Sequence, residues 1–213
     1  MPKIISIDPS GNGVTAIVVV DYDYSADEPV VIIDFAQVDF RAKDETNSER
    51  VKEIRYRQTE AVIEFVAEHN PYCVILENFI MFKQQMGEHG QSFVTAELIG
   101  ALDLELRRRK IPVIKPRSYD IRKIDGYGKA KVKYGLRTQD LHSRGILGKG
   151  KRNRTTLMVN GVPYDLIEYQ IGAKNDHLLM AIKHLINEIE YKKPDLFAKT
   201  EKIKSDRFQG LYE

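Results

Sequence analysis

The sequence is poor in cysteine and tryptophan and has no long apolar run: among 213 residues there is one cysteine and no tryptophan. Cys73 has no second cysteine to pair with, which excludes an internal disulfide, and its position in the apolar run 73–76 predicts a buried strand thiol in a reducing compartment. No stretch approaches the roughly 20 apolar residues of a membrane span, and Asp8 interrupts the N-terminal isoleucines before they reach signal-peptide length. We therefore expect a soluble protein without a membrane partner, located in the cytoplasm of a bacterial or phage-infected cell or in another reducing compartment that contains nucleic acid.

Hydrophobic residues make up 42% of the chain, which is enough to bury a core, and the length suits one medium domain better than two. We expect that domain to span residues 1–193. A charged C-terminal tail over residues 194–213 follows from Pro194 onward.

Positive charge is concentrated in one segment, although the net charge of the chain is only +2. Residues 107–154 contain 17 lysines and arginines but only three acids, a local charge of +14, so the rest of the chain carries −12. This segregation predicts a polyanionic partner. The alternative is a solvated basic face without a ligand, but such faces usually intersperse acids among the bases.

Apolar periodicity and turn residues predict an α/β fold. Strands alternate with helices in the order β-β-β-α-β-α-β-α, and a strand, helix, strand sequence implies a parallel crossover. The predicted strands are 3–8, 13–20, 30–38, 73–76 and 111–114, the predicted helices are 47–69, 92–110 and 175–191, and a hairpin signal around Asn160-Gly161 lies within 154–165.

Three carboxylates occupy corresponding places in this order. Asp8 and Glu77 each end an apolar strand, where ligands bind in open α/β sheets, and Asp176 lies in the first turn of the last helix. Each could separately be a turn residue, a surface acid or a helix N-terminal acid. Together they predict a site for Mg²⁺ or Mn²⁺, since both cations prefer carboxylate and water ligands.

Five segments resemble, in order, the motifs of RuvC-type Holliday-junction resolvases. They are residues 4–20 (IISIDPSGNGVTAIVVV), 74–82 (VILENFIMF), 111–116 (IPVIKP), 126–132 (GYGKAKV) and 175–184 (NDHLLMAIKH). The resemblance covers about residues 3–190. It implies a ribonuclease H-like fold with a mixed five-stranded sheet flanked by helices.

The resemblance also implies a Mg-dependent endodeoxyribonuclease that resolves four-way or other branched DNA by hydrolysing phosphodiester bonds. Asp8, Glu77 and Asp176 would hold two Mg²⁺ ions, with Mn²⁺ as a substitute, in each site of a homodimer. Phe79 and Phe82 lie just past Glu77, where an aromatic could enter the branch point. The expected contacts to the DNA backbone are Arg117, Arg122, Lys123, Lys129, Lys131, Lys133, Lys149, Lys151, Arg152 and Arg154.

Two features depart from the family pattern. Family members place a further acid or histidine one helical turn before the last aspartate, where this chain has Ala173. His177 points about 100° away from Asp176 on a helix, so the sequence does not offer it as an obvious substitute. A basic insertion at about residues 136–164 is longer than expected for the bacterial enzymes and resembles phage and viral members.

Other functions fit parts of the sequence. The turn 9–13 looks like the phosphate loop of an actin-like ATPase or sugar kinase, but those proteins need a second copy of the domain and a second glycine-rich loop. A terminase nuclease or a ribonuclease H would share the fold and the carboxylates. A DNA-junction-binding protein without turnover would keep the basic segment, and Ala173 is compatible with that function.

Overall fold

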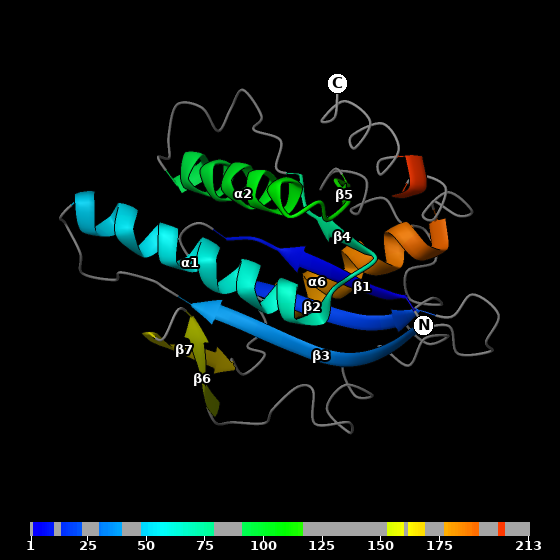
Figure 1. Cartoon of the computed structure of the whole chain (residues 1–213), viewed down its shortest axis with the longest axis horizontal. Coiled ribbons are helices and arrows are strands. Elements are labelled where there is room, and N and C mark those ends of the chain that lie inside the picture. Colours follow the sequence, from blue (N-terminus) through cyan, green and yellow to red (C-terminus); the bar gives the residue numbers. More distant parts are fainter. Residues whose placement is uncertain are drawn as a thin grey trace.

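The structure is a computed structural model (Figure 1), and it describes residues 2–10, 14–22, 30–39, 48–78, 91–116, 153–159, 162–168, 177–191 and 200–202. The strands are β1 (Lys3–Asp8), β2 (Val14–Tyr22), β3 (Val30–Asp39), β4 (Cys73–Leu76), β5 (Val113–Ile114), β6 (Asn153–Val159) and β7 (Val162–Glu168). The helices are α1 (Ser48–His69), α2 (Gln91–Arg108) and α6 (His177–Ile186), and a π-helical turn over Asn187–Tyr191 continues α6. The predicted order of elements is confirmed.

The sheet is mixed, with strand order β5-β4-β1-β2-β3-β7-β6. β1, β2 and β3 pair antiparallel, while β4 and β5 run parallel to β1, as the predicted crossovers require. The expected mixed five-stranded sheet flanked by helices is therefore present. The hairpin signal around Asn160-Gly161 is also confirmed, and the β6–β7 hairpin extends the sheet to seven strands through the pair Val38↔Leu166.

Helices α1 and α2 end at residues in the left-handed conformation. Asn70 has φ 44° and precedes Pro71, so α1 stops where the sequence predicts. Lys110 has φ 59°; its N–H bonds to the Arg107 carbonyl at 2.9 Å, and the Ile111 N–H bonds to the Leu106 carbonyl at 2.9 Å. These two bonds form a Schellman cap that turns the chain from α2 into β5.

Different helices cover the two faces of the sheet: α1 and α2 lie on one face and α6 on the other (Figure 1). Ile5 and Ile7 of β1 belong to a core that includes residues of α1 and α2, whereas Ile4 belongs to a second core with α6. β4 alternates in the same way: Val74 and Leu76 face α1 and α2, and Cys73 and Ile75 face α6. This period of two decides which face each polar residue reaches.

Three residues of the predicted C-terminal tail are described. Thr200 is buried, and the Tyr72 hydroxyl donates a 2.6 Å hydrogen bond to Glu201 Oε1, so Thr200 and Glu201 contact the domain. Cys73 is buried in β4, as predicted for a strand thiol. Within the described residues, no helix is long and apolar enough to cross a membrane.

Candidate metal centre

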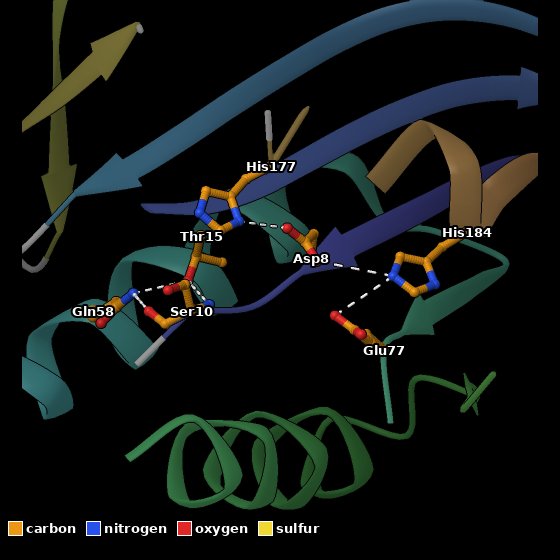
Figure 2. Close-up of polar contacts among 7 residues, drawn as sticks. All are labelled: Asp8, Ser10, Thr15, Gln58, Glu77, His177 and His184. Carbon is orange, nitrogen blue, oxygen red and sulfur yellow. Dashed lines mark hydrogen bonds and ion pairs between the residues drawn. The ribbon is translucent and has the colours of Figure 1, made fainter. Parts of the chain in front are cut away.

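The register of two parallel strands brings Asp8 and Glu77 together. Ile7 of β1 pairs with Leu76 of β4, and the Glu77 N–H donates to the Ile7 carbonyl at 3.3 Å. Asp8 follows Ile7 and Glu77 follows Leu76, so each acid comes directly after one member of this pair. Because side chains alternate along a strand, both acids point to the face of the sheet that α6 covers. The carboxyl groups of Asp8 and Glu77 therefore lie close together at the strand ends (Figure 2), and their role as metal ligands stays a prediction.

A third potential ligand comes from α6. His184 is 0% exposed, and its Nε2 lies 3.8 Å from Asp8 Oδ1 and 3.5 Å from Glu77 Oε2. One ligand atom from each of the three residues lies within 4.8 Å of the others. Among the described residues, neither ring nitrogen of His184 has a hydrogen-bond partner. Buried polar atoms are rarely left without partners, so this group of atoms fits a bound cation.

A second histidine contacts the other oxygen of Asp8. His177 Nδ1 lies 2.6 Å from Asp8 Oδ2, and its side chain is 25% exposed (Figure 2). His177 and His184 are two helical turns apart and therefore share one face of α6. Between them, Ser6 Oγ donates a 2.7 Å hydrogen bond to the Ala181 carbonyl, which holds this face of α6 against β1.

The two carboxyl groups differ in electrostatic environment. The pKa of Asp8 is raised to about 7, chiefly by burial; the hydrogen bond with His177 opposes the rise, and Glu77 adds to it. Burial also acts to raise the pKa of Glu77, but its interactions with His184 and Asp8 outweigh burial and leave that pKa below its usual value. Of the two carboxyl groups, Asp8 is therefore the one that keeps a proton to the higher pH. A divalent cation would favour the charged form of both groups.

A buried polar network fixes the chain next to Asp8. Gln58 of α1 donates through Nε2 to the Ser10 carbonyl at 3.1 Å and to Thr15 Oγ1 at 2.8 Å, and Thr15 Oγ1 also accepts the Ser10 N–H at 3.2 Å (Figure 2). Gln58 and Thr15 are almost fully buried. The network joins both arms of the β1–β2 connection to α1.

Several predicted site residues lie outside the described residues. α6 is described from His177, so Asp176 and Ala173 are not included. The same holds for Phe79, Phe82, Arg117, Arg122, Lys123, Lys129, Lys131, Lys133, Lys149, Lys151 and Arg152. Arg154 lies on β6, of which only the backbone is described. The DNA-contacting role of the two phenylalanines and the basic residues stays a prediction, and so does the metal-binding role of Asp176.

The N-terminal part of the basic segment forms ion pairs within the protein. Arg107 and Lys115 contact Asp103 at 2.7 and 2.9 Å. Arg108 contacts Glu105 at 2.6 Å, and Arg109 contacts Glu64 at 2.7 Å. Acids that precede the segment therefore offset these cations, and the expected phosphate contacts lie further along, from Arg117 onward.

Sequence analysis did not single out His184, although it lies at the end of the 175–184 motif. The available signal was its spacing from His177, because two histidines seven residues apart lie on one face of an otherwise apolar helix. Sequence analysis also gave His177 no specific partner. The structure shows that its ring reaches Asp8.

Solved structures show the same fold at low sequence identity. The chain is similar to Thermus thermophilus RuvC in complex with a Holliday junction substrate, with TM-score 0.54, 16% identity, and coverage of 91% of this chain and 96% of that one. A second Thermus thermophilus RuvC structure matches with TM-score 0.50 and 18% identity over 90% and 95% of the two chains. The large terminase of a thermophilic bacteriophage matches more weakly, with TM-score 0.43 and 14% identity over 88% of this chain and 40% of that one.

The two RuvC comparisons and the sheet topology define a ribonuclease H-like fold, the fold that RuvC has. At the level of sequence, no family model matches the chain, and no curated protein does.

Proposed function

We propose that this protein is a metal-dependent endonuclease that hydrolyses phosphodiester bonds in branched DNA, with the four-way junction as its substrate. The observation that carries the proposal is the convergence of Asp8, Glu77 and His184 at the strand ends, with the buried nitrogens of His184 unpartnered among the described residues. The fold shared with RuvC and the resemblance of five ordered motifs support the same function.

Asp8 and Glu77 would hold Mg²⁺ or Mn²⁺, and Asp176, expected beside them at the start of the last helix, would complete a site for two ions. Bound divalent cations supply a water of lowered pKa and neutralise charge on the reacting phosphate. His177 holds one oxygen of Asp8, while the other oxygen faces His184. Burial of Asp8 limits competing water around the carboxylates.

The basic residues from Arg117 to Arg154 would bind the DNA backbone without reading sequence. One of Phe79 and Phe82 would stack on bases at the branch point. We further propose a homodimer, whose two sites would nick opposite strands of one junction.

The direct test compares four substrates labelled on one strand: a four-way junction, its matched duplex, a flap and an RNA–DNA hybrid, each with Mg²⁺ or Mn²⁺. We expect paired nicks in the junction and little cleavage of the duplex. Asp103→Asn is the matched control for Asp8→Asn, because Asp103 is also a buried aspartate but lies on α2. The control should cleave normally, whereas Asp8→Asn should not cleave.

Other outcomes are informative. Preferred cleavage of the RNA–DNA hybrid would indicate a ribonuclease H. Unselective cleavage of the duplex would indicate a terminase-like nuclease. Tight junction binding with no cleavage under either metal would indicate a binding protein without turnover. The logarithm of affinity should fall with the logarithm of salt concentration by ~0.9 for each phosphate neutralised; a nearly salt-independent affinity would contradict the backbone contacts.

A further inference from the structure

We propose that His184 is a third protein ligand of the cation that Asp8 and Glu77 bind, and that its imidazole makes the centre select Mn²⁺ over Mg²⁺. The inference rests on the proposed function in placing a cation at Asp8 and Glu77. It adds a ligand from α6 and a preference between two metals, neither of which the carboxylates alone would provide.

The distances distinguish a ligand from a hydrogen-bonding residue. His184 Nε2 lies 3.5 Å from Glu77 Oε2 and 3.8 Å from Asp8 Oδ1. Both separations exceed the ~3.2 Å limit of a good N–H···O hydrogen bond. Two atoms bound to one cation at ~2.1 Å can lie up to about 4.2 Å apart. Both distances are within this limit, so one ion can contact the nitrogen together with either oxygen.

The burial of His184 points the same way. The residue is 0% exposed, and its two ring nitrogens have no hydrogen-bond partner among the described residues. An unsatisfied buried imidazole destabilises a fold unless another group compensates. A cation between Nε2 and the two carboxylates would satisfy this nitrogen. No described residue accounts for Nδ1.

The chemistry of the ligands predicts the metal preference. Mg²⁺ favours oxygen ligands and gives up its water reluctantly. Mn²⁺ prefers carboxylate and water ligands as Mg²⁺ does, but as a first-row transition ion it accepts an imidazole nitrogen more readily than Mg²⁺. One nitrogen beside two carboxylate oxygens therefore shifts the centre toward Mn²⁺. The neighbouring His177 is less suited to this role, because its Nδ1 already pairs with Asp8 at 2.6 Å.

The test measures metal binding directly, so it needs neither DNA nor a cleavage assay. Full-length protein labelled with ¹⁵N only in its five histidines is loaded with Mn²⁺, and pulsed electron paramagnetic resonance detects nitrogen bound to the ion. We expect a ¹⁵N coupling in the wild type and in His177→Gln, and its loss in His184→Gln. His177→Gln is the matched control, because the same substitution is made on the same face of α6 beside the same Asp8.

Titrations with each metal give the second readout. The ratio of Mn²⁺ to Mg²⁺ affinity should fall by about tenfold or more in His184→Gln. His177→Gln removes a partner of Asp8, so it should weaken both metals alike and leave the ratio near the wild-type value. The wild type and His177→Gln alone suffice if His184→Gln does not fold: no ¹⁵N coupling in the wild type, or its loss in His177→Gln that still binds Mn²⁺, overturns the proposal. A coupling that persists in folded His184→Gln, or an unchanged affinity ratio, also overturns it.

Failure of this inference is distinguishable from failure of the proposed function. A Mn²⁺ ion bound without nitrogen, in a protein that still cleaves junctions, would refute the ligand role of His184 and leave the nuclease intact. A nitrogen-bound Mn²⁺ in a protein that cleaves no substrate would support the ligand role of His184 and refute the nuclease function.

Discussion

The two faces of strand β1 differ in what their side chains contact. Toward α1 and α2, Ile5 and Ile7 are fully buried in an apolar core. Toward α6, Ile4 is equally buried, but the next two residues on that face are Ser6 and Asp8, which bond to Ala181 and His177. One short strand therefore supplies apolar packing on one side and positioned polar groups on the other.

The difference has an energetic cause. Burying an isoleucine stabilises the fold, whereas burying a carboxyl group costs free energy unless a partner compensates. The raised pKa of Asp8 shows this cost, because burial is the largest cause of the rise. On β1, the side chains toward α1 and α2 contribute apolar packing, whereas those toward α6 include polar groups whose burial costs stability. Substitutions on each side should separate these two properties.

The largest expected effect is on the α6 face. Asp8→Asn and Glu77→Gln should each reduce metal-dependent cleavage on the order of 10²-fold or more, because each removes a negatively charged ligand from the centre. Without metal, the free energy of unfolding of Asp8→Asn should hold or rise, because the neutral amide removes a desolvated acid that interacts with Glu77. Urea melts with and without Mg²⁺ beside a nicking assay measure both. Wild-type cleavage by either variant would show that its carboxylate is not a ligand.

The opposite face should give the opposite result. Ile7→Ala should lower the free energy of unfolding by ~2–5 kcal/mol, since it leaves a cavity in a fully buried position one residue before Asp8. The folded fraction should still cleave, because the register at Ile7 depends on backbone pairing with Leu76. Denaturant melts and cleavage rates per folded molecule test this. A loss of cleavage as large as that of Asp8→Asn would erase the distinction between the faces.

The network of Gln58, Thr15 and Ser10 is an exception within the α1 face and sharpens the comparison. Thr15→Val removes the oxygen that both other residues contact and should lower stability by ~1–3 kcal/mol. Thr15→Ser keeps that oxygen and should retain most of the stability. Equal melting temperatures for Thr15→Val and the wild type would show that the network contributes nothing to stability.

The smallest effect concerns Asp103, which lies on α2 just before the basic segment. Burial acts to raise its pKa, but Arg107 and Lys115 outweigh burial and lower it, so the charged form stabilises the fold. Because the folded pKa is depressed, this stabilisation is present above the ordinary value of 3.8 and is lost as pH falls through the lower, folded pKa.

Asp103→Asn should therefore cost ~1 kcal/mol near neutral pH, reduced by the partial exposure of its partners, and progressively less in acid. Melts of variant and wild type between neutral pH and about pH 2 give the difference. A cost that stays constant with pH would assign the effect to packing of the amide instead of charge.

The sequence alone determined the order of elements, the ends of α1 at Asn70-Pro71 and of β4 at Leu76, and the position of two acids just past apolar strands. These features are readable because strand and turn signals are local: apolar runs, a proline and the alternation of side chains lie within a few residues of each other.

Only the tertiary structure decided which residues meet those acids. The pairing Ile7↔Leu76 fixes the register, and the rotation of α6 about its axis selects His177 and His184 as neighbours of Asp8. The ion pairs of Arg107 with Asp103 and of Arg109 with Glu64 could not be predicted from the sequence. Both arginines were therefore counted with the rest of the basic segment. A helix with a broad apolar face can dock at several rotations, and side-chain packing over the whole interface chooses among them.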